Sequence, residues 1–76
     1  MPEQIVPTHA DGDQRFAFKV DNDAEVKVAM ERFNDLVKNQ KRTAVALGKD
    51  GAPGRLIRSF DPTVEKTIFM PQRQGG

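Results

Sequence analysis

The sequence predicts an α+β domain in which one long helix covers one face of a small sheet. Residues 15–20 alternate apolar and polar side chains, residues 23–39 carry apolar side chains at helical spacing, and residues 43–60 form two short runs around a glycine-rich turn. A chain of 76 residues has room for a single domain. Because a helix must bury its apolar stripe against another layer, we expect a two-layer sandwich with three to four strands, in the order β-α-β-β-(short helical turn)-β.

The N-terminal segment, residues 1–14, contains two prolines, one glycine and few apolar side chains. This composition predicts a flexible arm. The first strand is expected at residues 15–20, where Phe16, Phe18 and Val20 alternate with polar or small side chains and would face the core. The folded domain is therefore expected to begin at residue 15.

The helix is expected to begin after Asn22, whose side chain is placed to accept a hydrogen bond from an unpaired amide of the first turn. Glu25 follows at the spacing of a capping box. The helix should run to about Asn39. Its predicted apolar stripe consists of Val26, Ala29, Met30, Phe33, Leu36 and Val37.

The second half of the chain predicts a hairpin and a last strand. Strands are expected at residues 43–47 and 55–60, joined by a turn over residues 48–54 that contains three glycines. Asp61 followed by Pro62 predicts a single helical turn. Residues 67–70 predict the last strand, which Pro71 ends because proline cannot donate to a ladder. The domain would then span residues 15–71, and residues 72–76 would be a flexible polar tail.

The composition gives no support to an enzyme. The chain has no cysteine, which excludes disulfides, thiol nucleophiles and cysteine-ligated zinc. The single histidine, His9, lies in the expected flexible arm, whereas catalysis would need it fixed near a nucleophile or a carboxylate. The Asp11/Asp13 and Asp21/Asp23 pairs lack the later ligands of a calcium loop. We therefore expect no catalytic, cofactor-binding or metal-binding residues.

A basic patch is conceivable on the hairpin. Its members would be Lys41, Arg42, Lys49, Arg55 and Arg58, with Phe60 and Phe69 nearby for stacking on bases. Exposed charges on a hairpin more often serve solubility, and the net charge of the chain is only +1. This near-neutral balance argues against a nucleic-acid partner. No apolar stretch is long enough for a signal peptide or a membrane span, so we expect a cytoplasmic protein without a membrane partner.

The diglycine at Gly75-Gly76 resembles the ending of ubiquitin and of the bacterial sulfur carriers of thiamine and molybdopterin synthesis. The resemblance covers chain length and ending. It implies activation of the Gly76 carboxylate by an adenylating enzyme, whose narrow channel a tail without side chains can enter. Those proteins begin with a β-hairpin before the helix, whereas a single strand is expected before the helix here.

A second resemblance covers more of the chain. The segment from Asp13 through the helix, Gly48-Lys-Asp-Gly51, Phe60-Asp61-Pro62 with Glu65, and Pro71 with the diglycine together resemble small uncharacterised proteins of tailed phages and prophages. This resemblance implies a phage-derived gene and a virion or accessory protein. It implies no activity for any residue of this chain. It implies a location in the host cytoplasm or the virion.

We therefore expect a non-enzymatic protein–protein interaction module that docks on a larger assembly. The partners would be phage structural proteins or a second copy of the chain, and an edge of the sheet would add contact. The residues expected to mediate docking are Phe69, Met70 and Pro71, as the anchor where the tail leaves, and Gly75 and Gly76 in the tail. The alternative is a ubiquitin-like modifier or sulfur carrier activated at its diglycine.

Overall fold

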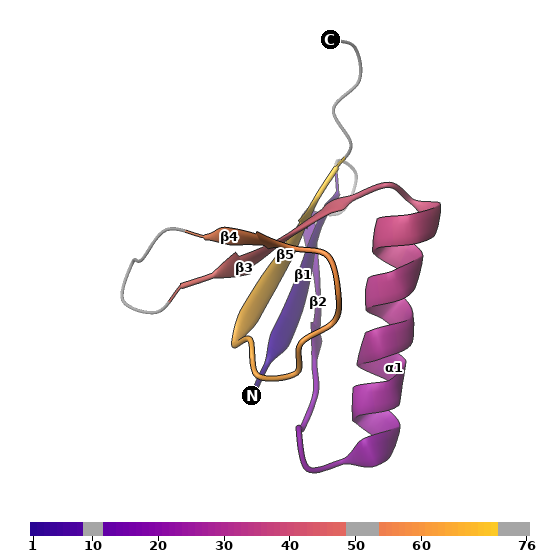
Figure 1. Ribbon diagram of the computed structural model, residues 1–76, viewed down its shortest axis with the longest axis vertical. Coiled ribbons are helices and arrows are strands. Elements are labelled where there is room, and N and C mark those ends of the chain that lie inside the picture. The colour runs from indigo at the N-terminus through magenta and orange to yellow at the C-terminus, as the bar shows by residue number, and fades with distance from the viewer. Residues whose placement is uncertain (9–11, 49–53, 72–76) are drawn as a thin grey trace, which may run out of the picture.

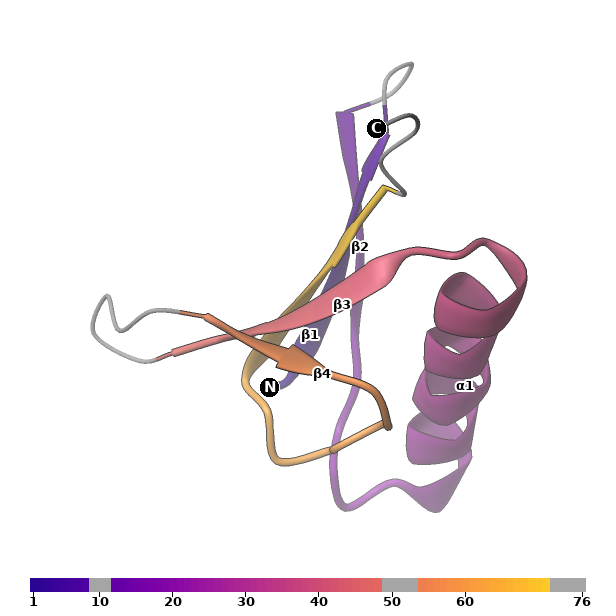
Figure 2. The same cartoon turned by 45° about the horizontal axis from the view of Figure 1, so that its top comes forward.

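The computed structural model describes residues 1–8, 12–48 and 54–71. Its elements are, in chain order, β1 (Glu3–Thr8), β2 (Gly12–Ala17), α1 (Asp23–Asn34), the π-helical turn η1 (Asp35–Asn39), β3 (Thr43–Leu47), β4 (Arg55–Ile57) and β5 (Lys66–Met70). The strands form one mixed sheet in the order β2-β1-β5-β3-β4. The helix lies along one face of this sheet (Figure 1; Figure 2). The α+β class is as predicted, but the sheet has five strands and two of them precede the helix.

The first strand, β1, corrects the prediction of a flexible arm over residues 1–14. Ile5 and Val6 are buried, and β1 lies between β2 and β5. Gln4, a polar side chain of this strand, is also buried. Its side-chain amide donates to the Ala29 carbonyl at 2.8 Å, and its carbonyl oxygen accepts from Arg32 Nε at 3.3 Å. The domain therefore begins at β1, and the helix supplies the partners that make burial of Gln4 tolerable.

The second strand begins and ends earlier than the predicted strand at residues 15–20. β2 covers Gly12–Ala17 and pairs antiparallel with β1, with Ile5 opposite Arg15. Phe18 follows the strand and is buried, whereas Val20 is exposed. The chain turns away from the sheet at this point because the helix cap begins immediately afterwards.

The helix starts as predicted. Asn22 is the N-cap, and its side-chain oxygen accepts from the Glu25 amide at 3.2 Å. The Glu25 carboxylate accepts in return from the Lys19 amide at 2.9 Å and from the Asn22 side chain at 3.0 Å. Ala29, Phe33 and Leu36 of the predicted stripe are buried, but Met30 is exposed at the side of the helix. No described helix is long and apolar enough to cross a membrane.

The core lies between this helix and the sheet. Its central cluster contains Val6, Phe33, Leu36, Ala44 and Phe69, one or more from each of β1, the helix, β3 and β5. The Phe33 and Phe69 rings meet edge to face, with centroids 5.5 Å apart. Such aromatic pairs add to the apolar burial that holds the two layers together.

The predicted hairpin is present in the part of the chain that the structure describes. β3 and β4 pair antiparallel with Val45 opposite Leu56, but β4 ends at Ile57 rather than at residue 60. Beyond it the Asp61 carboxylate accepts from the Thr63 amide and hydroxyl, which forms a turn in place of the predicted helical turn. β5 then enters the middle of the sheet, parallel to β1 and antiparallel to β3.

Candidate functional site

The face of the sheet opposite the helix carries a row of apolar side chains. Residues in register on neighbouring strands share a face. Ile5 is in register with Ile68, Ile68 with Val45, and Val45 with Leu56. Their chain neighbours Val6, Phe69 and Ala44 belong to the core under the helix, so this row points the other way. We call Ile5, Ile68, Val45 and Leu56 the open-face row.

The side chains of the row become more exposed from β1 toward the edge strand β4. Ile5 is buried, Val45 and Ile68 are half-buried, and Leu56 is 70% exposed. Met70 and Leu47 extend the apolar surface along β5 and β3, and both are exposed. A leucine this exposed is unremarkable alone, but a contiguous apolar stripe is typical of an interaction surface.

Gly54 keeps this surface accessible beside Leu56. A Cβ atom built at Gly54 would lie 2.7 Å from Val45 Cγ1 and 3.6 Å from Leu47 Cδ2. A side chain here would therefore force Val45 to move. The glycine thus leaves Val45 uncovered, next to the Leu56 end of the row.

The charges that border the row balance one another. On β1 and β2, Arg15 contacts Glu3 at 3.0 Å and Asp13 at 4.0 Å. Lys66 lies in register with Glu3 on the other side. Two cations thus stand beside two anions. A surface without net charge selects a partner by apolar contact more than by electrostatic attraction.

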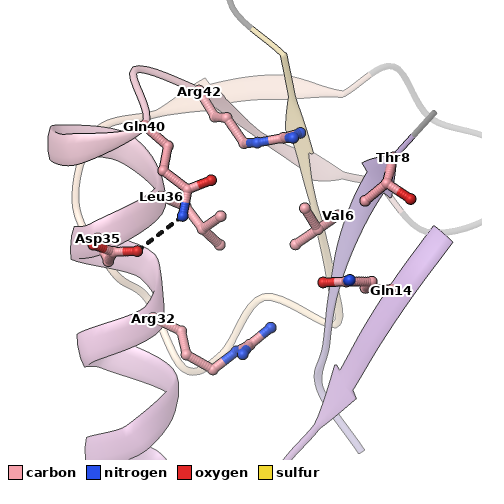
Figure 3. A pocket seen from close by; sticks show the side chains of 8 residues that line it. All are labelled: Val6, Thr8, Gln14, Arg32, Asp35, Leu36, Gln40 and Arg42. Carbon is pink, nitrogen blue, oxygen red and sulfur yellow. Dashed lines mark hydrogen bonds between the residues drawn. The ribbon is translucent and has the colours of Figure 1, made fainter. Parts of the chain in front are cut away.

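A polar cleft of about 310 Å³ lies on the helix side of the sheet, between the helix and β1–β2. Figure 3 shows Arg32 and Arg42 reaching into it from opposite ends, with Val6 and Leu36 between them. Arg32 donates to Gln4, and its guanidinium lies 4.8 Å from the centre of the Phe16 ring. The cleft therefore has charged ends over an apolar floor.

Arg42 holds the sheet together at the end of this cleft. Lys41 adopts a left-handed φ of 57°, and the Arg42 amide donates to the Leu36 carbonyl at 2.9 Å. From this turn the Arg42 side chain reaches the carbonyls of Pro7, at 3.2 Å, and Phe69, at 2.9 Å. Arg42 thus joins β1 to β5.

The position of Arg42 compensates for a missing amide. The Glu3 amide donates to the Glu65 carbonyl at 2.9 Å. In a parallel ladder this pattern advances by two residues on each strand, which would place the Pro7 nitrogen against the Phe69 carbonyl. Proline has no N–H. Arg42 Nη1 donates to the Phe69 carbonyl instead.

Asp35 also takes part in the rim of the cleft. Its carboxylate accepts from the Asn39 side chain at 2.7 Å and from the Gln40 side chain at 2.9 Å. These two hydrogen bonds lower the pKa of Asp35 below its ordinary value, and the bond from Asn39 has the larger effect. They fix the last turn of the helix, and the dashed line in Figure 3 marks the Gln40 bond.

The predicted anchor of the tail divides between core and surface. Phe69 is completely buried in the core, whereas Met70 and Pro71 are exposed. Pro71 borders a small cleft of about 200 Å³ with Pro7, Thr8 and Arg42. Gly75 and Gly76 lie outside the described residues, as does His9. Phe69 is therefore a core residue, and of the predicted docking residues that the structure describes, Met70 and Pro71 lie on the surface.

The predicted basic patch does not come together. Arg42 is turned inward, whereas Arg55 lies opposite Ala46, several residues along β3. Lys41, Arg55 and Arg58 are exposed, and Lys49 lies outside the described residues. The aromatic rings suggested for base stacking pack inside the domain: Phe60 and Phe69 both contact Phe33. The predicted members of the patch that the structure describes thus do not form a combined basic and aromatic surface.

The open-face row is not visible in the sequence because its members come from four strands. The register that aligns them depends on the insertion of β5 between β1 and β3, and no local pattern states that insertion. Within the residues that the structure describes, no cluster of histidine, cysteine, aspartate or glutamate is placed to hold a metal ion. Comparison with known proteins found no match among protein-family models, curated proteins or solved structures.

Proposed function

We propose that this protein is a non-enzymatic interaction module that binds a protein partner through the open-face row. The observation that carries the proposal is the contiguous apolar stripe that ends at Leu56, the most exposed large apolar side chain of the described residues. The partner supplies an apolar anchor, because the charges around the row balance. The sequence motifs that resemble those of small tailed-phage proteins favour a virion or accessory protein as the setting.

Site-specific photocrosslinking tests this proposal. A benzophenone amino acid replaces Leu56 in one variant and Val28 in a matched control. Val28 is also apolar and 44% exposed, but it lies on the helix. Irradiation in cells that express the tagged protein should give a discrete adduct from position 56 and none from position 28. Mass spectrometry of the adduct should find the crosslink at an apolar side chain of the partner.

The adduct should also depend on the apolar surface that extends the row along β3. Leu47→Asp places a charge beside Val45 and should weaken binding at least about tenfold, as loss of a central apolar contact does. The same adducts from both positions, or an adduct from position 56 that Leu47→Asp leaves unchanged, would contradict a role for the open face.

A covalent modifier or sulfur carrier is the second candidate, and one observation favours it. The β1–β2 hairpin precedes the helix, as in ubiquitin and the sulfur carriers. The sequence had predicted a single strand before the helix, in contrast to those proteins, and the structure does not show this difference.

A denaturing blot of an N-terminally tagged chain, with and without Gly75-Gly76, distinguishes this candidate. Intact-mass measurement first establishes whether the mature chain ends at Gly76 with a free carboxylate. Conjugation predicts heavier bands that disappear when the diglycine is deleted. Sulfur carriage predicts instead a mass increase equal to replacement of one oxygen by sulfur. An unmodified chain and a single band in both lanes would leave the interaction module alone.

A further inference from the structure

The strand β2 has one side without a partner in the described part of the chain. It forms an edge of the sheet, and all its residues except Phe16 are exposed. An edge strand offers a row of backbone donors and acceptors to another strand. What distinguishes this edge is the pattern of charges along it.

The hydrogen bonds of the β1–β2 pair determine which residues of β2 face outward. The Phe18 amide donates to the Pro2 carbonyl at 3.1 Å, which makes these two residues a hydrogen-bonded pair. Bonded and non-bonded pairs alternate along an antiparallel ladder. Gln14 and Phe16 therefore bond to β1, and Asp13 and Arg15 direct their N–H and C=O groups to the free side.

We propose that a second copy of this chain pairs its own β2 antiparallel with this edge, with Asp13 of each copy opposite Arg15 of the other. The outward backbone groups of both residues match in this register. An opposite-charge pair forms on each side of the two-fold axis. Opposite charges directly across two strands are stabilising, and like charges are destabilising.

The neighbouring registers are disfavoured by the same charges. A shift of one strand by two residues, the smallest shift that keeps the outward backbone groups matched, sets Arg15 against Arg15 in one direction and Asp13 against Asp13 in the other. In the proposed register Gln14 faces Gln14, and Phe16 faces Gly12. Gly12 has no side chain, and the space where its Cβ would lie is empty to 4 Å. The larger Phe16 ring of the other copy therefore has room.

The resulting dimer continues the sheet across the two-fold axis. Both helices lie on one face, and both open-face rows lie on the other. The contact involves one short strand from each copy and is smaller than a standard stable interface, so association is weak and depends on concentration. It does not cover the open-face row, so its failure or success is independent of the proposed function.

Sedimentation equilibrium at low salt over a range of chain concentrations tests this pairing. The set consists of the wild type, Asp13→Arg, Arg15→Asp and the double exchange Asp13→Arg/Arg15→Asp. Each single substitution turns both cross-strand pairs into like charges, so the dimer Kd should rise at least about tenfold. The double exchange restores opposite charges and should recover dimerisation. Thermal unfolding of each variant verifies that the fold is intact.

Asp13→Arg is the cleanest of these variants because it leaves the Arg15–Glu3 ion pair in place. High salt should also weaken the wild-type dimer, since screened charges contribute less. A wild type that stays monomeric at chain concentrations up to about 1 mM overturns the proposal. So do single variants that dimerise like the wild type, or a folded double exchange that stays as weak as the singles.

Discussion

Replacing Arg42 by alanine removes the donor that stands in for the missing amide of Pro7. The Phe69 carbonyl belongs to a completely buried residue, and loss of its donor leaves a buried acceptor unsatisfied. Such a loss costs about 1–3 kcal/mol. The Pro7 carbonyl belongs to a half-buried residue, so water replaces part of its bond to Arg42. We therefore expect Arg42→Ala to lower the free energy of unfolding by about 2–3 kcal/mol.

This amount is large for a domain of this size, whose core supplies about 3–5 kcal/mol of net stability. Urea denaturation followed by far-ultraviolet circular dichroism at neutral pH measures the change. Arg58→Ala is the matched control, because Arg58 is exposed and has no hydrogen bond or ion pair to another described residue. The control should stay within about 0.5 kcal/mol of the wild type, as surface substitutions do.

A double-mutant cycle with Pro7→Ala isolates the cause. Alanine at position 7 restores an N–H that points at the Phe69 carbonyl, so Arg42→Ala should cost about 1 kcal/mol less in that background. Equal costs in both backgrounds would refute the compensation of Pro7 by Arg42. If Arg58→Ala lowered the free energy of unfolding as much as Arg42→Ala does, positive charge in general, and not the hydrogen bonds of Arg42, would stabilise the sheet.

Two further predictions concern the core and an acid-sensitive turn. Phe33→Ala should cost about 3–5 kcal/mol, as truncation of a buried phenylalanine does, so circular dichroism should show a largely unfolded chain at room temperature. The pKa of Asp61 is lowered from 3.8, first by the Thr63 hydroxyl and then by the Thr63 amide. Its contribution to stability is therefore present above about pH 4 and is lost as the pH falls below that value. Thr63→Ala should move the Asp61 pKa, measured by carboxyl NMR shifts, toward 3.8, and an unchanged pKa would contradict the assignment.

The elements that the sequence predicted well are those determined by neighbours along the chain. The helix and its Asn22–Glu25 cap follow from local spacing and local hydrogen bonds, and both are present. The β3–β4 pairing likewise follows from two short runs around a turn. In each case the residues that stabilise the element are close to it in sequence.

The errors concern contacts between distant segments. The segment that contains β1 was predicted to be an arm because residues 1–14 contain two prolines, one glycine and few apolar side chains. Gln4 is satisfied by Ala29 and Arg32, which are 25 and 28 residues away. Arg42 was assigned to a basic patch because its charge is visible in the sequence, whereas its two acceptors lie on β1 and β5. The open-face row was missed for the same reason, since its register depends on where β5 enters the sheet.

The parallel pairing of β1 and β5 also determines how the domain responds to a mechanical load. Because β1 and β5 are parallel, the start of β1 lies at one end of the pair and the end of β5, at Met70, lies at the other end (Figure 1). A pull on both chain ends therefore slides the two central strands along each other. Under this shear, the hydrogen bonds between Glu3–Ile5 and Lys66–Ile68 bear the force at the same time. A hairpin pulled from its two ends instead opens one hydrogen bond after another. A domain tethered through its two ends would resist traction with the whole of its central pair.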